Sequence, residues 1–172
     1  MRAAGGGAPD GAGWLAASGW GVGRGGGGVP HEGQDARGAG DLAVAAGAGA
    51  RIGGTVVGEP VSGAPEYPLK TAQDALDVIA RTGRDNVRLL ADFYHLAVNG
   101  DDVAAVIEAH AAQFGHIQIA DDPGRGEPGT WQLPLQQWID RSRELGYDGV
   151  IGLEYKQSQE DPFAWLQASA RA

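Results

Sequence analysis

The chain of 172 residues contains no cysteine. Disulfide bonds, thiolate metal sites and cysteine nucleophiles are therefore excluded. No run of about 18 apolar residues occurs either, so we expect no membrane-spanning helix. The amino terminus lacks the apolar segment and cleavage site of a signal peptide, and we expect a cytoplasmic protein.

Positive charge is also scarce. Thirteen lysine and arginine residues face 22 aspartate and glutamate residues, which gives a formal net charge of −9 and a pI of about 4.7. An acidic surface repels the phosphate backbones of nucleic acids. We therefore expect a small-molecule substrate, and neither a nucleic acid nor a membrane as partner.

Glycine is abundant but unevenly distributed. Of the 30 glycines, 20 lie in residues 1–60. Residues 1–51 have the composition of a low-complexity Gly/Ala-rich segment, which we expect to be disordered. A GC-rich gene translated in the wrong frame would give the same composition, so a frame-shifted segment is an alternative.

Residues 52–172 have a different pattern, in which short apolar runs alternate with helical periodicity. Thr71 and Asp74 predict the start of one helix, and Gly83 predicts its end. A second helix is expected from Asp101 or Asp102 to Phe114. Strands are expected near residues 54–59, 86–92, 116–120 and 149–154. This alternation predicts an α/β fold with a parallel sheet and about four βα units.

Each expected strand ends with a side chain that offers an oxygen atom: Glu59, Asp92, Gln118 and Glu154. Their separations of 33, 26 and 36 residues are close to the length of one βα unit, about 30 residues. In a (β/α) barrel, such strand ends meet at one face and form the site. Two alternatives stay open here, namely Asp92 as a cap of the following turn and Gln118 as a core amide bonded to backbone.

Four segments resemble the C-terminal half of hydroxypyruvate isomerases, a family within the xylose isomerase-like TIM barrels. They are EPVSGAPEYPLKT, NVRLLADFYHL, GHIQIADDPGRGEPGT and GYDGVIGLEYK. The resemblance covers about residues 52–172 and implies a partial (β/α)8 barrel that contains strands five to eight. Gly58, and Trp131 with Gln132, depart from the family pattern. A sheet that lacks the first four strands has open edges, which predicts self-association.

The resemblance also implies the roles of individual residues. Glu59, Asp92, Gln118 and Glu154 would hold a divalent metal, and Glu59 and Glu154 would transfer protons. His95 and Arg125 would bind the substrate. Since all four ligand atoms are oxygens, Mg²⁺ or Mn²⁺ suits this set better than Zn²⁺.

The implied reaction converts hydroxypyruvate to 2-hydroxy-3-oxopropanoate (tartronate semialdehyde) through an enediolate, as part of glyoxylate metabolism. A proton must leave one carbon and return to its neighbour, which two carboxylates can accomplish. A cation stabilises the negative oxygens of the intermediate. The alternatives are a non-catalytic truncated or frame-shifted fragment, and a related sugar or keto-acid isomerase or epimerase.

Overall fold

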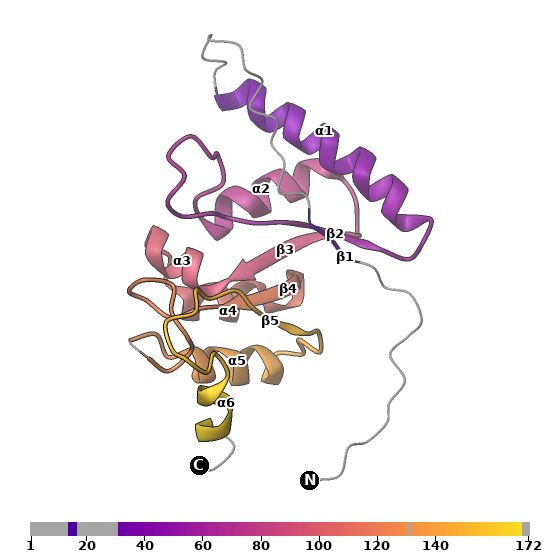
Figure 1. Ribbon diagram of the computed structural model, residues 1–172. Helices are drawn as coiled ribbons and strands as arrows, with labels where there is room; N and C mark the ends of the chain where they lie inside the picture. The colour runs from indigo at the N-terminus through magenta and orange to yellow at the C-terminus, as the bar shows by residue number, and fades with distance from the viewer. Residues whose placement is uncertain (1–13, 17–30, 131, 170–172) are drawn as a thin grey trace.

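A single parallel sheet forms the centre of the computed structural model, which describes residues 14–16, 31–130 and 132–169. Its strands occur in the order in which they follow one another along the chain (Figure 1). They are β1 (Trp14–Ala16), β2 (Thr55–Gly58), β3 (Val87–Asp92), β4 (Phe114–Ile119) and β5 (Ile151–Leu153). Within these described residues, β1 and β5 each have one edge that no strand pairs. Self-association through these edges stays a prediction.

Helices follow the strands along the chain, and several of them pack beside one another along the sheet (Figure 1). They are α1 (His31–Ala50), α2 (Ala72–Thr82), α3 (Phe93–Asn99), α4 (Val103–His110), α5 (Leu135–Glu144) and α6 (Ala164–Ser169). Sequential parallel strands with intervening helices follow the order of a (β/α) barrel. The predicted α/β fold with a partial barrel is confirmed, and β1 with α1 adds a unit to the four expected. No helix among the described residues is long and apolar enough to cross a membrane.

Helix α1 contradicts the expectation that residues 1–51 are disordered throughout. Its buried residues Ala39, Leu42 and Ala46 recur at helical spacing and belong to the main hydrophobic core. The Asn86 side chain donates hydrogen bonds to the carbonyl oxygens of Ala46 (2.9 Å) and Gly54 (3.1 Å). This packing offsets the poor helix propensity of the glycines. Among residues 1–30, only β1 lies within the described residues, and it pairs in parallel with β2.

Helix α2 begins and ends as predicted. The backbone N–H of Asp74 donates to the Thr71 hydroxyl (3.1 Å), and the Thr71 N–H donates to the Asp74 carboxylate (2.8 Å), so a complete capping box is present. Gly83 closes the helix at φ 59°. The second expected helix is shorter than predicted, because Phe114 is buried as the first residue of β4.

Alternate residues of β3 face opposite sides of the sheet. Val87, Leu89 and Ala91 belong to the hydrophobic core, whereas Asp92 faces a polar cluster at the end of the strand. On β2, a Cβ atom at Gly58 would meet only the Ile79 side chain, at 3.8 Å. A Cβ atom at this position would therefore be in ordinary van der Waals contact with α2.

Candidate metal centre

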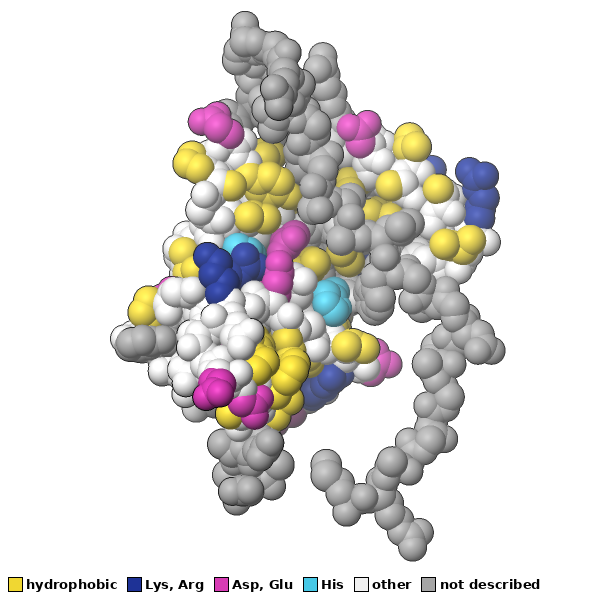
Figure 2. Space-filling view, viewed as in Figure 1, with side chains coloured by type: hydrophobic (Ala, Val, Ile, Leu, Met, Phe, Trp, Pro, Cys, Tyr) yellow, Lys and Arg dark blue, Asp and Glu magenta, His cyan; other side chains and the backbone are white. Residues whose placement is uncertain are grey.

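The strand ends bring the predicted ligand residues together. Asp92 ends β3, while Glu59 and Glu154 follow β2 and β5 directly. Gln118 of β4 pairs in register with Asp92 on one side and with Gly152 on the other. Ligand atoms of Glu59, Asp92, His95 and Glu154 all lie within 4.8 Å of one another. On the face drawn in Figure 2, acidic, basic and histidine side chains accordingly gather near the centre.

The two carboxylate oxygens of Asp92 have different environments. Oδ1 accepts hydrogen bonds from the backbone N–H groups of Tyr94 (2.9 Å) and His95 (3.2 Å), so Asp92 is the N-cap of α3. Oδ2 is buried and accepts no hydrogen bond from the described residues. The cap alternative is therefore correct for one oxygen, and the other oxygen is available as a ligand.

Gln118 has an equally unsatisfied oxygen. Its Oε1 is buried and has no hydrogen-bond partner in the described part of the chain. A Cβ atom at Gly152 would lie 2.8 Å from His116 Nε2 and 3.1 Å from Gln118 Cγ, so a larger residue there would displace these side chains. A buried acceptor without a partner costs about 1–3 kcal/mol. A cation bound to Oε1 would offset that cost. Gln118 is therefore not a core amide whose oxygen is bonded to the backbone.

Burial in the cluster raises the pKa values of two of its carboxylates. Burial, followed by the negative charges of Asp92 and Glu154, raises the pKa of Glu59 to about 7. Burial also raises the pKa of Asp92. Three crowded carboxylates and an unsatisfied amide oxygen form an all-oxygen donor set, which fits a hard divalent cation.

Arg125 extends into this cluster from the loop between β4 and α5. Its Nη2 atom lies 2.8 Å from Glu154 Oε2 and 3.6 Å from Asp92 Oδ2. The guanidinium also lies over the Tyr94 ring, 5.6 Å from the centroid. Arg125 has a left-handed backbone (φ 61°), which costs of order 1–3 kcal/mol and persists where the surroundings enforce it.

Two buried carboxylates that the sequence analysis missed hold the Arg125 loop. Asp121 accepts hydrogen bonds from the backbone N–H groups of residues 122, 129, 132 and 133. Glu127, which is 1% exposed, accepts from Ser158 N (2.7 Å), Gln159 N (3.0 Å) and the Ser158 hydroxyl (2.5 Å). Glu127 thereby joins the Arg125 loop to the segment that follows Glu154. The only local signal was the presence of acidic residues in a Gly/Pro-rich loop.

These hydrogen bonds predict a pH-dependent stability. The bonds from Ser158, together with that from Gln159, lower the pKa of Glu127 from 4.5 to about 2. The stabilisation is complete above pH 4.5, where the unfolded carboxylate is ionised, and is lost as the pH falls towards 2. We expect the stability difference between the wild type and Glu127→Gln, measured by urea unfolding, to shrink over this range. The exposed Glu160→Gln is the control, and an equal pH trend in both variants would contradict the assignment.

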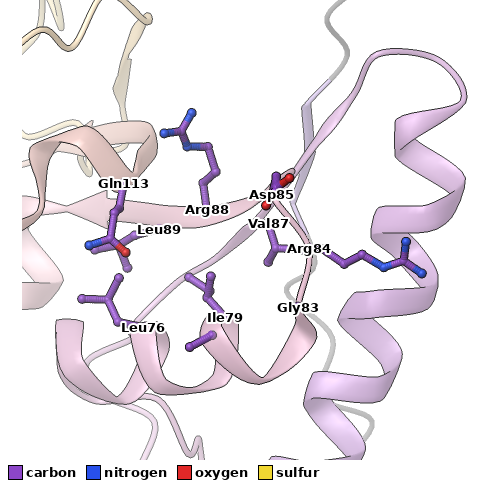
Figure 3. Close-up of a pocket in the computed structure, with 10 residues that line it drawn as sticks. Leu76, Ile79, Gly83, Arg84, Asp85, Val87, Arg88, Leu89 and Gln113 are labelled. Atoms are coloured by element: carbon purple, nitrogen blue, oxygen red, sulfur yellow. The ribbon is translucent and has the colours of Figure 1, made fainter.

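A pocket lies away from this cluster, at the opposite end of β3. It has a volume of about 310 Å³ between α2 and the start of the strand. Figure 3 shows Leu76 and Ile79 lining it, while the Arg84 side chain extends towards α1. Since no strand-end carboxylate lines it, this pocket is separate from the candidate metal centre.

Curated proteins that are similar to this chain are named as isomerases. A Streptomyces coelicolor protein named "Putative hydroxypyruvate isomerase" is 46% identical over 155 residues, which cover 84% of this chain and 55% of the relative. A 2-oxo-tetronate isomerase of Cupriavidus necator is 37% identical over 118 residues, 67% of this chain and 45% of the relative. The chain thus spans about half the length of these curated relatives.

Solved structures with other titled activities share the fold of this chain. The crystal structure of an AP endonuclease, family 2, from Brucella melitensis matches with a TM-score of 0.77 and 28% identity. That match covers 82% of this chain and 56% of the other. An Escherichia coli 3-keto-D-glucoside 4-epimerase matches with a TM-score of 0.74 and 26% identity, over 83% of this chain and 54% of the other.

The match to the family profile extends further towards the amino terminus than the resemblance of the four segments predicted. The profile described as Xylose isomerase-like TIM barrel matches residues 14–172. The predicted start of the resemblance at residue 52 is therefore wrong, and a wrong reading frame does not explain residues 14–51. The chain belongs to the xylose isomerase-like TIM barrel family.

Proposed function

We propose that this chain carries the metal-binding and proton-transfer residues of an isomerase that converts hydroxypyruvate to 2-hydroxy-3-oxopropanoate. The observation that supports this most is the cluster of strand-end carboxylates, completed by the unsatisfied oxygen of Gln118. Relatives named 2-oxo-tetronate isomerase, 35% and 37% identical to this chain, make a related 2-keto acid the second candidate substrate.

Glu59, Asp92, Gln118 and Glu154 would hold a divalent cation, with Mg²⁺ or Mn²⁺ best suited to the oxygen donors. When bound, the cation would stabilise the negative charge that develops on the substrate oxygens. The buried Oδ2 of Asp92 and Oε1 of Gln118 support this set, because neither has a hydrogen-bond partner among the described residues.

Glu59 and Glu154 would move the protons. The reaction removes a proton from the hydroxyl-bearing C3 of hydroxypyruvate and adds one to C2, while the hydroxyl proton passes from the C3 oxygen to the C2 oxygen. The carbonyl thereby moves from C2 to C3 without net oxidation. A base is most effective when its pKa is close to the working pH. In the metal-free chain the pKa of Glu59 is about 7, and the positive charge of a bound cation would lower it, so Glu59 would be ionised at neutral pH and able to accept the first proton.

Arg125 and His95 would bind the substrate. The Arg125 guanidinium can pair with the substrate carboxylate through two parallel hydrogen bonds. It lies at the edge of the cluster, where the Glu154 side chain is 44% exposed and open to an incoming ligand. The buried His95 contributes a ring nitrogen to the same cluster.

The test is isomerisation of hydroxypyruvate by the purified full chain, after treatment with a chelator and after addition of Mg²⁺ or Mn²⁺. We expect metal-dependent turnover, which Glu154→Ala abolishes and Glu144→Ala on the exposed face of α5 leaves unchanged. Unchanged turnover in Glu154→Ala would refute the role of Glu154. A wild-type chain without turnover would support the alternative of a non-catalytic fragment, and faster conversion of 2-oxo-tetronate would identify that acid as the substrate.

A further inference from the structure

His95 receives a hydrogen bond that determines the position of its ring proton. The backbone N–H of Ser62, in the loop after β2, donates to His95 Nδ1 at 3.1 Å. The Ser62 hydroxyl lies 2.7 Å from the same nitrogen. His95 itself is 4% exposed and belongs to α3, so these contacts join two separate βα units.

A backbone N–H can only donate, so Nδ1 must offer its lone pair. A neutral imidazole that accepts at Nδ1 carries its proton on Nε2. The Ser62 hydroxyl can rotate to donate to Nδ1 as well. A proton on Nδ1 would instead point at the Ser62 N–H, and two donors would oppose each other.

The protonated nitrogen faces the carboxylate cluster. His95 Nε2 lies 3.8 Å from Asp92 Oδ2, which is too long for a hydrogen bond but places the donor beside the ligand residues. An Nε2 that carries a proton has no lone pair for a metal. His95 is therefore a donor within the cluster, and Gln118 is left as the fourth ligand.

We propose that Ser62 is a positioning residue that holds His95 as a neutral Nε2–H donor, directed at the substrate oxygen on which negative charge develops. The part about the substrate rests on the proposed function. The tautomer and the exclusion of His95 from the ligand set do not, because they follow from the Ser62 contacts alone.

The tautomer is measured by two-bond ¹H–¹⁵N correlation spectra of the chelator-treated full chain labelled in its histidines. The signals that vanish in His95→Gln identify His95 among the four histidines. We expect a protonated Nε2 and an unprotonated Nδ1 in the wild type. Ser62→Ala keeps the backbone N–H and should keep this tautomer, whereas Ser62→Pro lacks that N–H and should give averaged signals. A wild-type Nδ1–H, or averaging in the wild type, overturns the inference whether or not Ser62→Pro folds.

Metal titration provides a second readout that needs no turnover. Titration with Mn²⁺ alone should give the same affinity for His95→Phe as for the wild type, because His95 is not a ligand. A loss of affinity in His95→Phe would overturn the inference.

Turnover then tests the donor role. Removing one such donor reduces kcat by about 10²–10³-fold in other enzymes. We expect a loss of that order in His95→Phe and a partial recovery in His95→Gln, whose amide restores a donor. Equal kcat values for the two variants would refute this role. If the tautomer is as stated but the wild type has no turnover, the proposed function fails while the assignment of Ser62 stands.

Discussion

Replacing Asp92 by asparagine is expected to weaken Mg²⁺ or Mn²⁺ binding by at least about 100-fold. Mutating a residue that only hydrogen-bonds to a metal ligand already lowers metal affinity by about 10–100-fold, and Asp92 is a proposed ligand itself. The asparagine Oδ1 can still accept the N–H groups of Tyr94 and His95, so α3 stays capped. Its amide nitrogen replaces Oδ2, however, and offers no lone pair to a cation. Calorimetric titration with each metal measures the loss.

Asp92→Ala is the matched comparison, because it removes the cap as well as the ligand. Loss of an N-cap costs about 0.5–2 kcal/mol, and we expect Asp92→Ala to be less stable than Asp92→Asn by this amount in urea unfolding. The metal-free Asp92→Asn should be at least as stable as the wild type, because burial disfavours the charged form of Asp92. Full metal affinity in Asp92→Asn would exclude Asp92 as a ligand.

Glu59→Gln is expected to reduce metal-dependent turnover by about 10²–10⁴-fold, the usual contribution of a positioned acid or base. The pKa of about 7 further predicts that metal binding displaces a proton from Glu59 below neutral pH. The metal affinity of the wild type should then fall about tenfold per pH unit below 7 and level off above it. Titrations in buffers with different ionisation enthalpies count the protons released.

The same pKa predicts how the stability of the metal-free chain depends on pH. A carboxyl group whose pKa is raised by folding keeps its proton in the folded state between pH 4.5 and about 7, where the unfolded chain loses it. The stability of the wild type relative to Glu59→Gln should therefore fall as the pH rises through this window. The exposed Glu66→Gln should follow the wild type, and a flat difference between the wild type and Glu59→Gln would contradict the shifted pKa.

The strand-end residues were predictable because their signal is local. Asp92 follows an apolar run directly, and the capping box at Thr71 lies within four residues of sequence. Helix α1 was missed although Ala39, Leu42 and Ala46 have helical spacing, because the glycines around them lower helix propensity. Packing against α2 stabilises α1, and that contact appears only in the folded chain.

The contacts of Ser62 and Glu127 were not predictable for a different reason. Ser62 is 33 residues from its hydrogen-bond partner His95 along the sequence, and Glu127 is 31 residues from its partner Ser158. Short polar residues in loops have no periodicity that would reveal a partner so distant in sequence. Only the alignment of neighbouring parallel strands brings these loops together.

The proposed ligands each come from a different βα unit. A bound cation would therefore change the local unfolding of the strand ends. A bound cation would connect the ends of β2, β3, β4 and β5, which no disulfide can join in a chain without cysteine. Ligands that bind only the folded state raise the free energy of every opening that breaks the site. Backbone amides at these strand ends should then exchange with solvent as one cooperative unit, whereas in the chelated protein each strand end would fray independently.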